Sequence, residues 1–290
     1  MVTAKDVAEL RARTGAGMMD CKKALDESQG NMDLAVEILR KRGIAKAEKR
    51  IDRQASEGQI ALIVAPDGQS GSLIEVNSET DFVGRNDEFV AFSKAVAEHI
   101  ALDENVNGVV HVGAQGQLLD ATWKHDGTRT VGEVVKGISA KTGENVVLRR
   151  VARFSTDGTI GTYLHHNGRV AVMVEVAGKG AAVEQLAKTV AEHVAAGVPA
   201  VPVAVNREEV AVELVDRERR IFTEQAASSG KPANIVEKMV EGRIAKYFGE
   251  VVLLEQPWVR DDSKTIGALV KEAGSGVTIR RFARFQMGEA

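Results

Sequence analysis

The feature that most constrains the fold of this 290-residue chain is an internal duplication of its larger, C-terminal part. The segment Lys94–Ala101 recurs as Lys188–Ala195, and Val146–Phe154 recurs as Val277–Phe285. These matches keep the same order in both copies. We therefore expect two related structural units, because a repeated pattern of apolar residues buries the same faces each time.

Each copy has the order strand, strand, helix, helix, strand. Apolar residues alternate in the strand segments, whose turns contain glycine, and recur three and four positions apart in the helical segments. This pattern predicts an α+β core built from small antiparallel sheets with helices on one face. We expect the first core subdomain at residues 54–155 and the second at residues 156–290.

The segment before the duplication, residues 1–53, predicts three short helices and a basic linker. Thr3 can cap the first helix, Thr14–Gly17 separates it from the second, and the third is expected to end at Gly43. In the second helix, Met18, Cys21 and Leu25 have helical spacing. Residues 40–53 carry seven Lys and Arg side chains against two acidic ones, which is typical of a solvated helix or linker. RNA or an acidic partner surface could also bind there.

One loop distinguishes the two copies. Between the second strand and the first helix, the offset between matching residues falls from 100 to 94, so the first copy holds six residues that the second lacks. Phe82 lies in this insertion among acids, hydroxyls and glycine, where a large aromatic side chain contributes little to folding. It could fold back as a lid on its own domain. The second copy is complete without the loop, which favours a partner-binding role instead.

The second copy has an insertion of its own. Asn206–Glu209 has the spacing of a capping box and is expected to open a helix, and a turn at Ser228–Pro232 leads into another. This predicts a helical hairpin at about residues 206–247. The hairpin could pack as core or project as an arm for a partner or a second copy of the chain. Both core copies look complete without it, which favours the arm.

The sequence contains no familiar catalytic motif. The phosphate-loop, dinucleotide and zinc-protease patterns are all missing. His99 and His193 occupy equivalent positions, which indicates a scaffold role. His165 and His166 are expected in a hairpin turn at residues 163–168, and adjacent residues of a strand point to opposite faces, which argues against a shared metal. We therefore predict a protein that is not an enzyme and needs no cofactor or metal. A hydrolase using Asp81 with a histidine would require a concave site that brings them together.

Composition excludes several broad classes. The net charge of −3 gives the whole chain no general attraction for nucleic acid or anionic membranes. A single cysteine, Cys21, excludes an intrachain disulfide. The N-terminus has no apolar signal core, and no apolar run is long enough to span a bilayer. We expect a cytoplasmic protein without stable nucleic-acid or membrane binding.

Two long stretches, Thr14–Leu25 and Glu75–Asn86, resemble the bacterial translation elongation factor Ts family. The order of parts also resembles that family: an N-terminal helical domain, a duplicated core, and a hairpin in the second half. The resemblance implies an N-terminal bundle similar to ubiquitin-associated domains. It also implies a guanine-nucleotide exchange factor that binds elongation factor Tu, in GDP-bound and nucleotide-free forms, and accelerates GDP release.

The resemblance also implies which residues contact that partner. A nucleotide-release wedge would enter beside the nucleotide and its magnesium; its residues are Thr80, Asp81, Phe82 and Val83. The N-terminal bundle would hold the same partner domain through Gly15, Ala16, Gly17, Met18 and Met19. A contact from the second core half falls on His165 or His166, because an extra residue in that turn leaves the choice open. The helical hairpin offers a surface for a homodimer.

Overall fold

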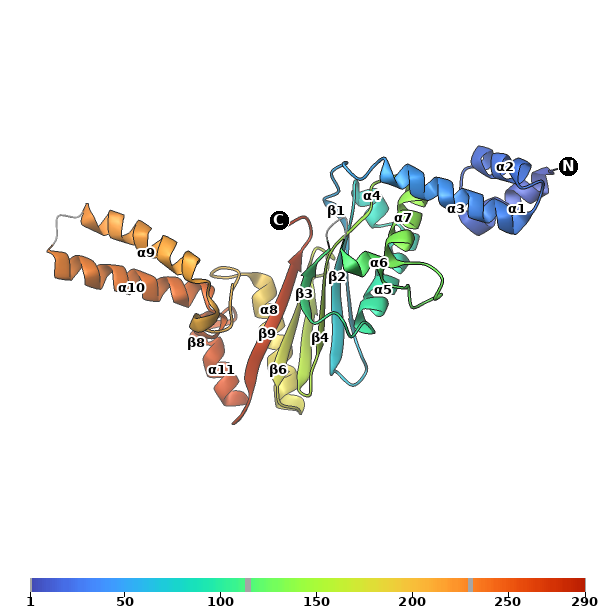
Figure 1. The fold of residues 1–290 in the computed structure, drawn as a ribbon. Coiled ribbons are helices and arrows are strands. Elements are labelled where there is room, and N and C mark those ends of the chain that lie inside the picture. The colour runs from blue at the N-terminus through green and yellow to red at the C-terminus, as the bar shows by residue number, and fades with distance from the viewer. Residues whose placement is uncertain (1, 113–115, 229–231, 290) are drawn as a thin grey trace. The chain divides into compact units, whose positions relative to one another are not determined.

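The computed structural model describes residues 2–112, 116–228 and 232–289 (Figure 1). Its contacts divide the chain into two compact units. The first unit comprises Met1–Ile63, Ile74–Ala152 and Gln286–Ala290, and the second comprises Val64–Leu73 and Arg153–Phe285. Helices and strands are mixed in both units, so the predicted α+β class is confirmed. The further division into three domains stays a prediction.

Three helices precede the duplicated core. They are α1 (Ala4–Thr14), α2 (Met18–Glu27) and α3 (Met32–Glu48). Thr3 caps α1 as expected: its hydroxyl accepts a hydrogen bond from the Asp6 amide, and the Asp6 carboxylate accepts one from the Thr3 amide. The seam between the helices is closed by Leu10, Cys21 and Leu25, all fully buried. The first two predicted helices are confirmed.

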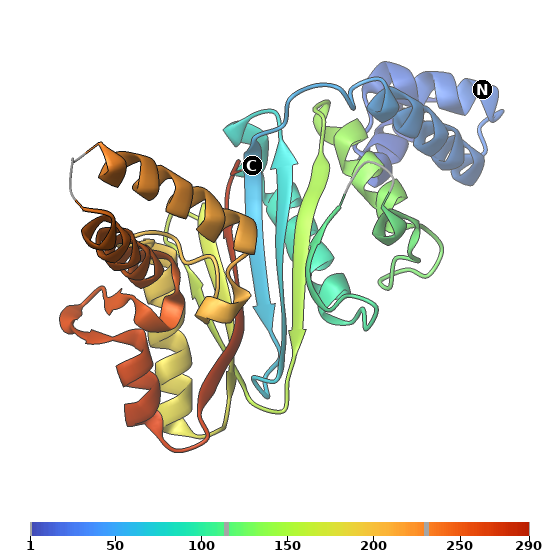
Figure 2. The same ribbon diagram turned by 60° about the vertical axis from the view of Figure 1, so that its left-hand side comes forward.

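The first core copy is a four-stranded sheet packed against helices. Its strands are β1 (Glu57–Val64), β2 (Ser70–Ser78), β3 (Gly108–His111) and β4 (Val147–Ser155), in the spatial order β1-β2-β4-β3 (Figure 2). Its helices are α4 (Asp81–Gly84), α5 (Asp87–Ala101), α6 (Gln117–Asp120) and α7 (Val131–Thr142). Phe89 and Val96 of α5 share one buried cluster with Ile138 of α7 and Ile74 of β2, so both long helices cover the sheet.

The prediction that α3 ends at Gly43 is wrong, because the helix continues to Glu48. A Cβ atom on Gly43 would lie 2.9 Å from the Cβ of Ala140 in α7. The glycine therefore lets two helices cross closely and does not end one. Glycine inside a helix costs about 1 kcal/mol relative to alanine, and the packing at this crossing offsets that cost. An ion pair of 3.0 Å between Arg40 and Glu133 flanks the crossing.

The second core copy repeats the pattern. Its strands are β5 (Thr159–Leu164), β6 (Val170–Ala177) and β9 (Thr278–Gln286) in the order β5-β6-β9, and its helices are α8 (Ala181–Ala196) and α11 (Ile266–Ala273). β5 and β6 pair antiparallel, with Thr159 opposite Val176 and Leu164 opposite Ala171. A small antiparallel pair, β7 (Pro257–Trp258) with β8 (Asp261–Thr265), was not expected from the sequence.

The duplication extends to individual buried contacts within each copy. Glu75 on β2 pairs with Arg150 on β4 at 2.7 Å, and Glu175 on β6 pairs with Arg281 on β9 at 2.6 Å. Both acids are buried, and each is satisfied by an arginine of the neighbouring strand. Gly58, the second residue of β1, lies so close to β2 that a Cβ would be 2.1 Å from the carbonyl oxygen of Val76.

The hairpin inserted in the second copy consists of α9 (Val212–Ala227) and α10 (Ala233–Val251). The prediction that its first helix opens at Asn206–Glu209 is wrong, because α9 begins at Val212. Residues 207–209 form a separate 3-10 turn, η1 (Arg207–Glu209), in which the Glu209 carboxylate accepts hydrogen bonds from the Val205 amide and the Asn206 side chain. Val210 is then buried and ends this turn before α9 starts. The expected turn at residues 228–232 lies partly outside the described residues.

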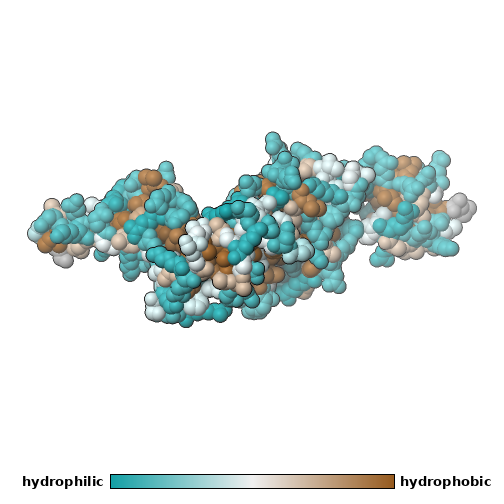
Figure 3. Space-filling model, turned by 90° about the horizontal axis from the view of Figure 1, so that it is seen from below, coloured by the Kyte–Doolittle hydropathy of each residue, from teal (hydrophilic) through white to brown (hydrophobic). Residues whose placement is uncertain are grey.

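The outer part of the hairpin has a core of its own. Ala226, Val240 and Ile244 form a buried cluster with Phe222, Val236 and Phe248, and all of these residues belong to α9 or α10. The two helices therefore pack on each other, as an arm would. Hydrophilic residues dominate the face seen in Figure 3, with small hydrophobic areas between them. Among the described residues, every helix is too short or too polar to cross a bilayer.

Candidate functional site

The loop that distinguishes the first copy folds into a short helix. Residues 81–84 form α4, and the Thr80 hydroxyl caps it by accepting a hydrogen bond from the Val83 amide at 3.4 Å. In the second copy the chain passes from β6 to α8 through residues 178–180 alone. In the first copy residues 79–86 connect β2 to α5, so the longer connection expected from the sequence is confirmed, and it contains one ordered turn of helix.

The two sides of α4 differ sharply in exposure. Val83 packs against the core cluster of the first unit, and Gly84 is buried against Gly58 so closely that a Cβ would lie 2.7 Å from its carbonyl oxygen. The Gln59 side chain also donates a hydrogen bond of 2.6 Å to the Gly84 carbonyl. Phe82 points away from these contacts and is 85% exposed. The alternative that Phe82 is a lid on its own domain is therefore wrong, because Val83 and Gly84 occupy the buried side of α4 and the Phe82 ring does not.

Asp81 lies beside Phe82 at the start of α4. Its carboxylate forms an ion pair of 3.0 Å with Arg85, one helical turn later. Both side chains are well exposed, and pairs of this kind contribute about 0.5 kcal/mol or less. The pair is therefore easily exchanged for a stronger interaction, and Asp81 is presented next to the exposed ring.

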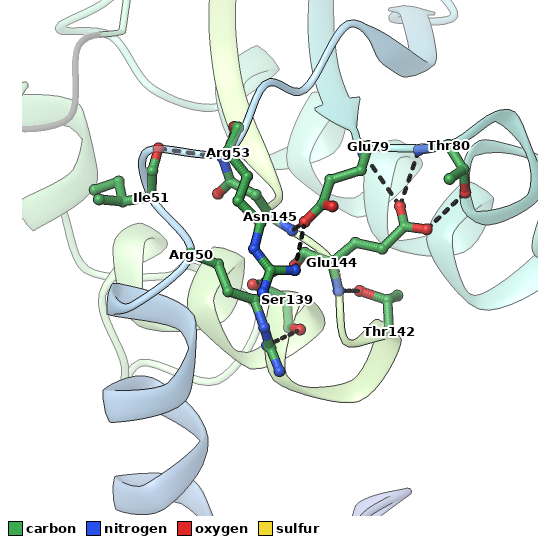
Figure 4. Close-up of polar contacts among 9 residues, drawn as sticks. All are labelled: Arg50, Ile51, Arg53, Glu79, Thr80, Ser139, Thr142, Glu144 and Asn145. Carbon is green, nitrogen blue, oxygen red and sulfur yellow. Dashed lines mark hydrogen bonds and ion pairs between the residues drawn. The ribbon is translucent and has the colours of Figure 1, made fainter.

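A hollow of about 450 Å³ lies beside α4 in the first unit. It is lined by Thr80, Phe82, Val83, Asn86, Glu88, Lys141, Thr142 and Glu144. Glu144 holds the base of the loop: its carboxylate accepts hydrogen bonds from the amides of Glu79 and Thr80, each at 3.1 Å (Figure 4). Sequence patterns missed Glu144, because it belongs to no recognisable motif and follows Thr80 by 64 positions.

The predicted N-terminal contact residues form the tight turn between α1 and α2. Gly15 ends α1 with φ +68°, and Gly17 caps α2 without a side-chain hydrogen bond. Met18 and Met19 are 53% and 65% exposed, so Met18 does not share the buried stripe of the second helix that its spacing predicted. It is the first residue of α2 and lies beyond the seam. A Cβ on Gly15 would lie 3.7 Å from the side chain of Lys141, which also lines the hollow beside Phe82.

His165 and His166 lie in the second unit, in the turn after β5. The strand ends at Leu164, so both histidines lie in a turn as expected; the opposite faces of a strand do not apply there, and the two ring centroids are 4.2 Å apart. Nδ1 of His165 lies 2.9 Å from the Tyr163 hydroxyl. His165 is half-buried, and His166 is exposed. Within the described ranges, no cluster of three or more metal-ligating side chains is present.

His99 and His193 are buried, as the scaffold interpretation predicts. Burial lowers the pKa of both imidazoles. Nδ1 of each accepts a backbone hydrogen bond, from Lys124 at 3.2 Å and from Val259 at 3.3 Å. They therefore serve equivalent structural roles in the two copies.

The basic segment between residues 40 and 53 is largely balanced within the chain. Five of its seven cations form ion pairs: Arg40–Glu133, Lys41–Glu37, Arg42–Glu27, Lys46–Asp20 and Arg53–Glu79. A sixth, Arg50, donates to the carbonyl of Ser139 at 3.2 Å. This arrangement favours the interpretation as a solvated helix and linker over that as an RNA site.

Comparison with known proteins identifies the family. The model of the family described as elongation factor TS matches residues 79–289. Elongation factor Ts of Clostridium perfringens is 46% identical over 296 residues, covering 100% of this chain and 94% of that protein. The protein of the same name from Thioalkalivibrio sulfidiphilus is 44% identical over 290 residues, covering 99% of this chain and 92% of its own length. This chain therefore belongs to the elongation factor Ts family of translation elongation factors.

Proposed function

We propose that this chain is a guanine-nucleotide exchange factor that binds elongation factor Tu and accelerates GDP release during translation elongation. The observation that carries the proposal is Phe82, which is 85% exposed on an inserted helix whose other side is fixed to the core. A large exposed aromatic side chain on a rigid base is suited to entering a pocket of another protein. Membership of the elongation factor Ts family supports elongation factor Tu as that protein.

The wedge comprises Thr80, Asp81, Phe82 and Val83. Phe82 enters the partner's nucleotide-binding domain, and Asp81 brings a carboxylate toward the magnesium and phosphates. If the weak ion pair between Asp81 and Arg85 opens in the complex, the Asp81 carboxylate can interact with the magnesium ion instead. No bond is made or broken in this process, so the chain acts as an exchange factor and not as an enzyme, and needs no cofactor.

The energetics require more than the wedge. An exchange factor must bind better to the state that holds nucleotide weakly, and the coupling is reciprocal. Weakening the nucleotide by ten-thousand-fold requires about 5.5 kcal/mol, whereas burial of one phenylalanine supplies about 1.5–3 kcal/mol. Further contacts therefore come from the N-terminal turn, Gly15–Met19, and from His165 or His166 in the second unit.

The surroundings of the function follow from the same proposal. The factor acts in the cytoplasm and binds both the GDP-bound and the nucleotide-free partner. It forms no stable complex with nucleic acid, which the internal pairing of the basic segment supports. The self-packed hairpin of α9 and α10 is the surface through which two copies of the chain would dimerise.

The direct test is the Phe82→Ala variant in a stopped-flow assay of fluorescent GDP release from elongation factor Tu. Loss of the ring that the partner would bury should slow stimulated release by about tenfold or more. Thermal stability of the free chain should be unchanged, because Phe82 is exposed there. Leu102→Ala is the matched control, since Leu102 is also a large exposed apolar side chain of the first unit. Release rates equal to wild type in the Phe82→Ala variant would defeat the wedge.

A further inference from the structure

The anchor of the wedge is a single carboxylate from a distant part of the chain. Oε2 of Glu144 accepts hydrogen bonds from the amides of Glu79 and Thr80, and Oε1 accepts one from the Thr80 hydroxyl at 2.6 Å (Figure 4). The helix α7 ends at Thr142, Gly143 caps it in the left-handed conformation, and Glu144 is the next residue. Three charge-assisted hydrogen bonds therefore converge on the base of α4.

The hydroxyl of Thr80 takes part in two interactions at once. It donates its proton to Glu144, and its oxygen accepts the hydrogen bond from the Val83 amide that caps α4. A hydroxyl has one proton and two lone pairs. Because the hydroxyl proton points to Glu144, a lone pair of the Thr80 oxygen faces the first turn of α4. The direction of the helix that carries Asp81 and Phe82 is thereby fixed.

Neighbouring residues brace the same anchor. The amide of Asn145 donates a hydrogen bond of 2.6 Å to the Glu79 carboxylate, and its side chain donates one of 2.7 Å to the carbonyl of Arg53. The Ser139 hydroxyl donates to the carbonyl of Glu144 at 2.6 Å. The turn after α7 is therefore hydrogen-bonded both to the linker at Arg53 and to α7 at Ser139. Glu144 has little freedom to move away from the loop.

The second core copy lacks both the wedge and the anchor. From the paired residues Thr130 and Thr265 to the paired residues Val146 and Val277, the offset between copies falls from 135 to 131. Accordingly α7 has 12 residues and α11 has 8, a difference of one helical turn, or about 6 Å of helix. The turn that follows reads Gly143-Glu144-Asn145 in the first copy and Gly274-Ser275-Gly276 in the second. The scaffold therefore does not need this carboxylate, and it occurs only in the copy that carries the loop.

We infer that Glu144 is a positioning residue for nucleotide exchange: its carboxylate fixes Thr80 as the cap of α4 and thereby the direction in which Asp81 and Phe82 meet the partner. This role rests on the exchange function proposed above. Glu144 acts through the loop and needs no contact with the partner itself. Its loss should lower the rate of exchange within the complex more than the affinity of the complex.

The first measurement uses the free chain and no partner. In Glu144→Ala, amide hydrogen exchange of residues 79–84 should accelerate by about tenfold or more, because the loop loses hydrogen bonds to a charged acceptor. Glu144→Gln retains an oxygen acceptor and should recover most of the protection. Glu88→Gln is the matched control, because Glu88 lines the same hollow but its carboxylate pairs with Lys141 and not with the loop backbone. This variant also loses one negative charge. Equal exchange in all four proteins would overturn the inference.

The second measurement is stimulated GDP release from elongation factor Tu over a range of factor concentrations. Glu144→Ala should lower the maximal rate by about tenfold with a smaller change in the half-saturating concentration, and Glu144→Gln should restore most of the rate. In a Phe82→Ala background, adding Glu144→Ala should have little further effect, because both changes act through one loop.

The two proposals fail in different ways. A wild-type chain that does not stimulate GDP release would overturn the exchange function, whatever the hydrogen-exchange result. A wild-type chain that stimulates release, with Glu144→Ala equally fast at saturation, would overturn only the positioning role. Additive effects of Phe82→Ala and Glu144→Ala would likewise show that Glu144 does not act through the loop.

Discussion

At the scale of single residues, the two buried histidines occupy the same core position in both copies, and each ring nitrogen Nδ1 accepts a backbone hydrogen bond. Nδ1 of His193 accepts from the Val259 amide, so Nε2 carries the proton and donates it to Gln256 at 3.0 Å. The amide of Gln256 in turn donates to the carbonyls of Ala200 and Glu250, which turns its oxygen toward the imidazole. His99 accepts from Lys124 in the same way. Both rings are therefore held in the neutral form.

These histidines predict a pH dependence of stability. Burial lowers the pKa of His99 and His193 below their ordinary value of about 6.5, so the unfolded chain binds protons first as the pH falls. The contribution of these histidines to the free energy of unfolding should be at its maximum above pH 6.5. It should decrease as the pH falls toward 5, by up to about 1.4 kcal/mol per pH unit for each histidine. Urea unfolding at a series of pH values measures this slope.

A control separates the histidines from the acids. The lowered pKa of Glu175 also favours the folded state, but that contribution is lost only at pH values below the ordinary glutamate range. His193→Gln should therefore flatten the slope between pH 6.5 and 5 while lowering the overall stability. A free energy that does not change across this window in the wild-type chain would contradict the assignment.

At the scale of elements, the crossing of α3 and α7 connects the N-terminal helices to the first core copy. Gly43 and Ala140 meet there, and the C-terminal turn of α7 continues into the anchor formed by Glu144. The same turn is the one by which α7 exceeds α11. One additional turn of helix thus supports both the packing of α3 and the position of the wedge.

The crossing predicts a non-additive pair of substitutions. Gly43→Ala would place two Cβ atoms 2.9 Å apart, which forces the helices to separate and should cost about 1–3 kcal/mol of stability. Adding Ala140→Gly removes the clash, so the double variant should be more stable than Gly43→Ala alone. Chemical denaturation of the three variants gives the coupling free energy.

The matched control for this pair is Gly242→Ala in α10. A Cβ at Gly242 would meet open space, so the change should stabilise the chain by up to about 1 kcal/mol through helix propensity. If Gly43→Ala behaved like Gly242→Ala, the close crossing would not limit the residue at position 43.

At the scale of the whole molecule, one scaffold has been used twice and extended differently in each copy. The first copy carries α4 and a longer second helix, and the second carries the hairpin of α9 and α10. Each copy nevertheless keeps its own buried cluster and its own buried glutamate–arginine pair. The extensions can therefore change without loss of either core.

Removal of residues 1–53 tests the independence of the core. The truncated chain should retain a cooperative melt, because both buried clusters lie in residues 54–290. Its melting temperature should fall, since α7 loses the packing of α3 and Asn145 loses the carbonyl of Arg53. Calorimetry checks the melt, and titration with GDP-loaded elongation factor Tu should show weaker association than for the full chain. A truncated chain without a cooperative transition would refute this view of the core.

The sequence alone determined the duplication, the insertion in the first copy and the main order of each copy, although not the short strands β3, β7 and β8. These features depend on local patterns, such as apolar spacing and the Thr3 cap, or on comparison of the chain with itself. The insertion marked Phe82 as a residue outside the scaffold, and its exposure agrees with that.

Only the tertiary structure decided the remaining features. It showed that Gly43 lies inside a helix, that Asn206 opens a separate turn, and that Glu144 anchors the loop. Each of these depends on side chains that are distant in sequence: Ala140 meets Gly43, and Glu144 reaches Thr80 across 64 positions. Local patterns record what a residue prefers by itself, whereas a close helix crossing or a shared carboxylate is chosen by whichever partner the fold brings within reach.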